Sequence, residues 1–171
     1  GAAHFPYVSA MARFLATDDR IPEMLVVGIA SVDQKHRVRD LSPPSSSERD
    51  NRFMPGNGGA AAFLAFLESE LIPLIDRDYR TRPHRMLAGH SLGGLFAVHV
   101  WVTKPQLFQA YAAIDPTLSW NDGRFLAQTD AFLSQSKGLA TDLHITAAGD
   151  GGIVSGDIRK FVSLLEKKAP S

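Results

Sequence analysis

Residues 85–104, RMLAGHSLGGLFAVHVWVTK, decide the fold of this chain. At their centre, residues 89–93 read GHSLG and match the pattern G-x-S-x-G, in which a serine lies on a sharp turn from a strand into a helix. Side chains two residues before and two after the serine would collide in such a turn, so we expect both Gly89 and Gly93 to be required. The pattern predicts Ser91 as an exposed nucleophile.

The residues on either side of this turn support the same interpretation. An apolar run at residues 86–88 enters the turn and is typical of a short strand. The residues that follow are apolar on nearly every side, which predicts a buried helix, and Gly94 and Ala97 would let that helix lie close to a sheet. The alternative is a glycine-rich turn in which the serine is incidental.

Strands alternate with helices along the rest of the chain, which predicts an α/β fold with a mainly parallel sheet. Apolar runs predict strands at residues 25–29, 86–88, 110–114 and 143–148. Helical patterns cover residues 6–16, 58–78, 92–104, 125–133 and 156–165. Pro73 is expected to kink the second of these helices, because its ring excludes a backbone hydrogen bond to residue 69. The polar residues 31–57 are expected to form a long loop at the rim of the site.

The composition limits the class of protein. A chain of 171 residues, 44% of them hydrophobic, suffices for one domain over residues 1–171. Eighteen basic and eighteen acidic residues give no net charge, which argues for a small-molecule partner and against nucleic acid or a membrane surface. The absence of cysteine and of a His-x₃-His spacing predicts no metal site, and we expect no cofactor. The sequence does not decide between cytoplasm and periplasm.

Six segments together resemble a known family. They are AHFPYVSAMARFLA (residues 3–16), IPEMLVVGI (21–29), RDLSPPSS (39–46), GGAAAFLAFLESELIPLIDRDYRT (58–81), GHSLGGLFAVH (89–99) and LFQAYAAIDPTLSWNDG (107–123). The chain is similar to the esterase group of the α/β-hydrolase fold, which contains siderophore trilactone esterases, feruloyl-type esterases and, more distantly, esterase D and the mycolyltransferases. The resemblance implies a three-layer α/β-hydrolase sandwich and a serine hydrolase that acts on an ester through a Ser-His-acid arrangement.

Two parts of this family's fold are missing from the sequence. In the hydrolase fold the nucleophile, the acid and the histidine follow one another along the chain, but no histidine follows His144 here. Relatives also have a strand that comes just before residues 3–5 in the chain. In their sheet this strand lies between the strands expected at residues 25–29 and 86–88. A sheet without it would leave two rows of buried backbone groups unpaired. We therefore expect an incomplete domain, without the first strands and without the last strand and the catalytic histidine.

The resemblance assigns roles to residues around the turn. Ser91 needs a neighbouring base, which we expect to be a histidine outside residues 1–171. The backbone N–H of Leu92 would stabilise the oxyanion, while its side chain packs in the core. A second N–H would come from the segment near Ala3.

Two aspartates are candidates for the acid that orients the histidine. Asp150 follows the last predicted strand, at the sheet edge where the fold supplies its acid, and the alternative is a turn residue within Gly-Asp-Gly-Gly. Asp115 also ends a predicted strand at this edge, where relatives usually have serine. Some siderophore-type relatives work with a Ser-His pair and little help from an acid, so neither assignment is forced.

Three further residues are candidates for substrate binding. His4 adjoins the segment expected to complete the oxyanion hole. Arg39 would hold an anionic group of the substrate, or carry ordinary surface charge. Trp120 would form an apolar wall of the pocket, or belong to the core. The leading function is an ester hydrolase that forms an acyl-enzyme; the alternatives are a non-catalytic binding module and an acyltransferase that uses the same serine.

Overall fold

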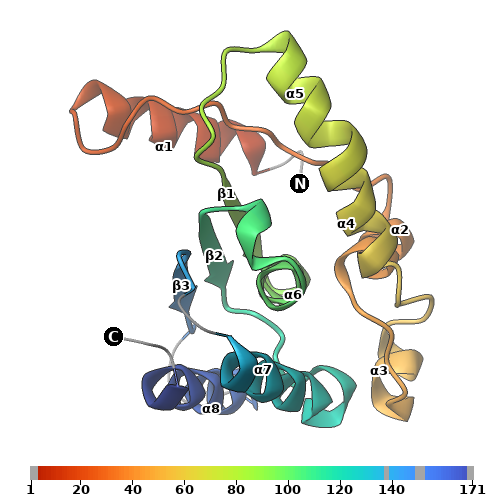
Figure 1. Cartoon of the computed structure of the whole chain (residues 1–171). Coiled ribbons are helices and arrows are strands. Elements are labelled where there is room, and N and C mark those ends of the chain that lie inside the picture. Colours follow the sequence, from red (N-terminus) through yellow and green to blue (C-terminus); the bar gives the residue numbers. More distant parts are fainter. Residues whose placement is uncertain (1–3, 137–138, 149–152, 169–171) are drawn as a thin grey trace. The chain divides into compact units, whose positions relative to one another are not determined.

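A computed structural model describes residues 4–136, 139–148 and 153–168 (Figure 1). The chain divides into two compact units, Gly1–Arg37 and Val38–Ser171. Each unit has its own internal contacts, and the strands and the predicted nucleophile belong to the second. Among the described residues, no helix combines the length and the apolar composition needed to cross a membrane.

The first unit contains helix α1, Phe5–Thr17, and an extended segment after it. Pro6 lies in the first turn of α1, where its missing N–H costs nothing. The strand predicted at residues 25–29 is not formed: Leu25, Val27 and Ile29 are exposed and have no regular secondary structure. That prediction is wrong because an apolar run becomes a strand only when a neighbouring strand accepts its backbone hydrogen bonds.

The sheet lies in the second unit and consists of three parallel strands. They are β1 (Met86–His90), β2 (Ala110–Ile114) and β3 (Asp142–Thr146), in the order β1-β2-β3. The register places His90 opposite Ile114, and Ile114 opposite Thr146, so all three strands end at one edge of the sheet. Three of the four predicted strands are therefore confirmed, and the residues after each of them meet at this edge.

Helix α6, Leu92–Thr103, packs against β1 and β2 and forms the centre of the core (Figure 1). The ring of Trp101 contacts Phe132 of α7 (Arg124–Gln135) and Phe161 of α8 (Ile153–Lys168), at centroid distances of 5.2 and 6.3 Å. Edge-on contacts of this kind fix the three helices to one another. The buried helix predicted after the serine is confirmed.

The helix predicted at residues 58–78 is interrupted by a π-helical turn, and the kink expected at Pro73 stays a prediction. The helix is built from α4 (Ala60–Phe66), a π-helical turn η1 (Leu67–Leu71) and α5 (Ile72–Asp78). The N–H of Ile72 donates to the carbonyl of Leu67, five residues back. The wider turn shifts the hydrogen-bond register just before the proline, which has no N–H of its own.

Residues 31–57 are not the long loop that their polarity suggested. They contain α2 (Gln34–Leu41) and α3 (Glu48–Phe53). Asp33 accepts the N–H of His36 at 2.8 Å, and Ser47 caps α3 through the N–H of Asp50. These side-chain caps start short helices that periodicity alone does not reveal.

His99 is the one polar side chain in the middle of α6. Its ring lies 6.4 Å from that of Phe96, and its Nε2 is buried without a hydrogen-bond partner among the described residues. Burial lowers the pKa of His99, because the charged imidazolium would lose its hydration there.

The folded state should therefore lose stability in mild acid through His99. Above about pH 6.5 both the folded and the unfolded chain leave the ring neutral, so no penalty arises. Below that pH the unfolded chain binds a proton that the folded one resists, and the free energy of unfolding falls. Urea titrations at several pH values between 5 and 8 give the free energy of unfolding as a function of pH. This free energy should change less with pH in His99→Leu than in the wild type. His84→Leu, a change in an exposed loop, is the control. An equal pH dependence of the free energy of unfolding in His99→Leu and the wild type would contradict this account.

Candidate active site

Ser91 occupies a strained turn between β1 and α6. Its φ and ψ are 58° and −116°, a backbone region that residues other than glycine rarely adopt. Its N–H donates to the carbonyl of Ile114 at 3.0 Å, and its own carbonyl accepts the N–H groups of Leu95 at 2.9 Å and Thr117 at 3.4 Å. Hydrogen bonds to the end of β2 and into α6 thus hold the serine in this conformation.

The two glycines of the motif are not equivalent. A Cβ added to Gly89 would lie 2.1 Å from the carbonyl oxygen of Gly93, which no side chain can occupy. A Cβ on Gly93 would meet nothing within 4 Å. The expectation that both positions require glycine is corrected: the backbone of Gly93 fills the space that Gly89 must leave empty. Gly94 is also restricted, because its Cβ would lie 3.0 Å from Pro116.

Ser91 is a partly exposed residue, and its side chain makes no capping bond to its own helix. The next residue, Leu92, starts α6 with its side chain 2% exposed in the core. No described residue accepts a hydrogen bond from the N–H of Leu92. An N–H in the first turn of a helix carries part of the positive end of the helix dipole, which favours a negative charge beside it. Burial of the side chain and a free N–H are thus compatible at Leu92.

None of the four histidines of the second unit, all of them described, hydrogen-bonds to Ser91. His90 and His144 are exposed on β1 and β3, and His36 pairs with Asp33 at 2.7 Å. His4 is exposed at the start of α1 in the first unit, and its role in substrate binding stays a prediction.

Of the predicted acids, only Asp115 lies among the described residues. It follows β2 with φ 47°, donates its N–H to the carbonyl of Thr146 at 2.9 Å, and accepts the N–H of Ala148 on Oδ1 at 3.2 Å. Asp150 and Ala3 lie outside the described residues, so their roles stay predictions.

The other two candidates for substrate binding differ in exposure. Trp120 is 1% exposed and donates its indole N–H to the carbonyl of Pro43 at 3.0 Å, so it belongs to the core and does not offer an open apolar wall. Arg39 lies on α2 with an exposed side chain whose Nε is 2.7 Å from Asp40. Its substrate role stays a prediction.

A buried carboxylate that the sequence did not reveal joins helix α3 to the turn at residues 120–123 of the second unit. Asp50, 5% exposed, accepts the N–H of Asn121 at 2.6 Å and the hydroxyl of Ser45 at 2.8 Å. Asn121 and Asp122 both have left-handed backbone conformations, with φ 55° and 52°. The only sequence signal is the run Asn-Asp-Gly at residues 121–123, which is typical of left-handed turns but does not indicate the distant partner.

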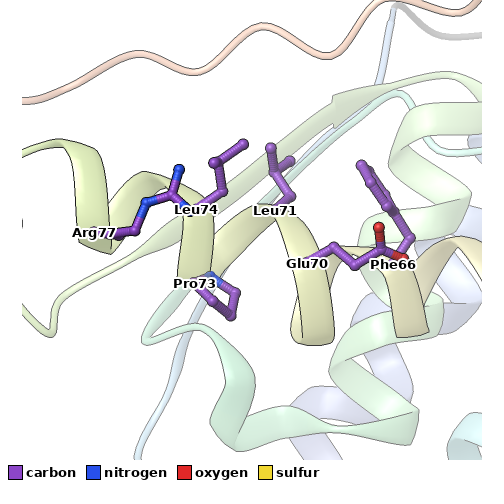
Figure 2. A pocket seen from close by; sticks show the side chains of 6 residues that line it. All are labelled: Phe66, Glu70, Leu71, Pro73, Leu74 and Arg77. Carbon is purple, nitrogen blue, oxygen red and sulfur yellow. The ribbon is translucent and has the colours of Figure 1, made fainter.

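A hollow of about 400 Å³ lies on the interrupted helix, and Figure 2 shows the side chains that line it. Its lining side chains are Phe66, Glu70, Leu71, Pro73, Leu74 and Arg77. All of them come from α4, η1 and α5, and none from the turn around Ser91, so this hollow is not the binding pocket of the nucleophile. Within the described ranges, no group of three or more His, Asp or Glu side chains is placed to hold a metal ion.

A model of the family described as "Putative esterase" matches residues 3–148. The chain belongs to this esterase family. The ferri-bacillibactin esterase BesA of Bacillus subtilis (strain 168) is 40% identical over 121 residues, which are 67% of this chain and 42% of BesA. The siderophore triacetylfusarinine C esterase of Aspergillus fumigatus is 35% identical over 107 residues, 61% of this chain and 35% of that protein.

Solved structures show the same fold for this esterase-family chain. An IroE-like serine hydrolase from Shewanella oneidensis matches with a TM-score of 0.86 and 27% identity, over 99% of this chain and 58% of the other. The predicted α/β-hydrolase fold, a parallel sheet flanked by helices, is thereby confirmed. The chain spans less than half the length of the curated relatives it matches.

The inequality of the two glycines can be tested by matched alanine variants. Gly89→Ala should lower the free energy of unfolding by about 2 kcal/mol or more, because its methyl group collides with the Gly93 carbonyl. Gly93→Ala should change it by less than about 1 kcal/mol, since the methyl enters open space in the first turn of α6. Urea denaturation of both variants measures the difference, and equal costs would refute it.

The strain at Ser91 should appear as a gain in stability when the side chain is removed. Glycine tolerates the observed φ, so Ser91→Gly should be more stable than Ser91→Ala by about 1 kcal/mol. Both variants lack the hydroxyl, so Ser91→Ala controls for its loss. Thermal or urea unfolding gives the comparison; a less stable glycine variant would show that the turn is not strained.

Proposed function

We propose that the full-length protein is a carboxylic ester hydrolase with Ser91 as its nucleophile. The observation that carries this proposal is the backbone of Ser91, a partly exposed residue held at φ 58° beside the free N–H of Leu92. Strain of this kind persists only where the surrounding structure enforces it, and it clusters at sites of chemistry. Membership of the esterase family supports the same assignment.

The proposed reaction has two halves. Ser91 Oγ attacks the carbonyl carbon of the ester while a base takes the hydroxyl proton, and the negative charge on the carbonyl oxygen is stabilised by the N–H of Leu92. The C–O bond to the alcohol then breaks, the base returns the proton to the leaving alcohol, and an acyl-enzyme remains. Water attacks the acyl-enzyme by the same route and releases the acid and free Ser91.

We assign the remaining roles by the order of the hydrolase fold. The base is a histidine of the full-length protein outside residues 1–171, Asp150 is its acid partner, and Asp115 is the alternative. Ala3 supplies the second N–H of the oxyanion hole. His4 and Arg39 contact the substrate, Arg39 through an anionic group.

We propose a siderophore ester as the substrate class. The support is that the relatives named above are called esterases of ferri-bacillibactin and triacetylfusarinine C, and that they match 67% and 61% of this chain. The exposed guanidinium of Arg39 suits the anionic groups of an iron-chelating ligand.

A fluorophosphonate probe tests the nucleophile in the full-length protein. It should label the wild type on Ser91 and leave Ser91→Ala unlabelled, because the probe bonds covalently to an activated serine oxygen. Mass spectrometry of the labelled peptide identifies the residue. Gly93→Ala, which removes neither the hydroxyl nor the Leu92 N–H, controls for general disturbance of the turn and should still be labelled. Equal labelling of wild type and Ser91→Ala, or none of the wild type, would defeat the proposal.

A further inference from the structure

We propose that Asp115 is a positioning residue and not the acid of the catalytic arrangement: its carboxylate fixes the chain that leaves β3 relative to Ser91. This inference rests on the proposed function, because it concerns how the site of Ser91 is assembled. It chooses between the two aspartates that the sequence left open.

Asp115 lies between two sets of hydrogen bonds, one to Ser91 and one to the end of β3. On one side, its neighbours Ile114 and Thr117 bond to the N–H and the carbonyl of Ser91, at 3.0 and 3.4 Å. On the other side, the N–H of Asp115 reaches the carbonyl of Thr146 at 2.9 Å. This bond completes the last register pair of the β2–β3 ladder, Ile114 and Thr146.

The side chain of Asp115 then adds the next bond. Its Oδ1 accepts the N–H of Ala148 at 3.2 Å, two residues beyond the Thr146 carbonyl that the backbone already holds. The backbone of β2 turns away at Asp115 and can no longer offer a carbonyl to Ala148. The carboxylate oxygen takes the place of that missing carbonyl, as Asp side chains do in turns.

The backbone of Asp115 shows why an aspartate suits this position. Its φ of 47° lies in the left-handed region, which Asp, Asn and Gly tolerate far better than other residues. Of these three, Asp and Asn carry a side-chain oxygen that can accept the Ala148 N–H. Positioning therefore needs an oxygen on a short side chain, whereas orienting a catalytic imidazolium needs a negative charge.

Asn and Gly variants separate these two needs, because both fit the observed backbone. Asp115→Asn keeps the acceptor oxygen and removes the charge, while Asp115→Gly removes both. In the full-length protein we would measure kcat and KM for a p-nitrophenyl ester, the rate of fluorophosphonate labelling, and hydrogen exchange of the Ala148 amide. Circular dichroism and the melting temperature show that each variant is folded.

Asp115→Asn should keep kcat and KM within about threefold of the wild type and keep Ala148 protected. Asp115→Gly should raise the exchange rate of the Ala148 amide by about fivefold, as expected from one lost hydrogen bond. Its kcat should fall by tenfold or more with a smaller change in KM, because misplacement of catalytic groups by about 1 Å costs up to about a hundredfold. A positioning role requires that kcat be much higher in Asp115→Asn than in Asp115→Gly.

Three results would overturn the inference, and they differ from one another. A loss of about 10⁴-fold in kcat for Asp115→Asn would make Asp115 the catalytic acid. Wild-type kcat and Ala148 exchange in Asp115→Gly would show that the carboxylate positions nothing. A wild-type protein that neither hydrolyses the ester nor reacts with the fluorophosphonate would remove the proposed function itself, whatever the two variants do.

Discussion

The structure depends on the left-handed backbone of Ser91. A residue with a side chain enters this conformation only at a cost of about 1–3 kcal/mol, so other contacts must enforce it. One comes from Ile114 at the end of β2, a second from Thr117 in the segment after β2, and a third from Leu95 in α6. The turn can form only if β1 and β2 lie side by side and parallel and if Gly89 leaves room for the carbonyl of Gly93.

Helix α6 makes this arrangement rigid. It is buried along nearly its whole length, and Trp101 near its end joins the rings of α7 and α8. The helix therefore cannot shift without opening the core. Its first N–H groups are held next to Ser91, at the end of β1. The positive end of the helix dipole is thus fixed beside the serine by the packing of the core. Preorganisation of this kind is what electrostatic stabilisation of an oxyanion requires.

Two aspartates of the second unit, Asp50 and Asp115, accept hydrogen bonds from backbone N–H groups that are remote in the sequence. Asp50 accepts the N–H of Asn121 across a distance of 71 residues in sequence, and Asp115 accepts that of Ala148 across 33. Both join a loop after β2 to another segment. A carboxylate with four lone-pair positions can replace the ladder where strands end and loops begin. The loops at the carboxyl edge of the sheet are therefore held by side-chain oxygens.

The sequence by itself determined the parts whose causes are local. The spacing of glycines around Ser91, the apolar runs of β2 and β3 and the all-round apolar pattern of α6 predicted the turn, three strands and the central helix. Tertiary structure decided the rest, because the deciding partners are remote in the chain. Residues 25–29 form no strand in the described structure, although they are as apolar as the runs that do, since a strand needs a neighbour for its backbone groups. The burial of Trp120 and the bonds of Asp50 and Asp115 likewise depend on which segments fold side by side, and no spacing in the sequence encodes that.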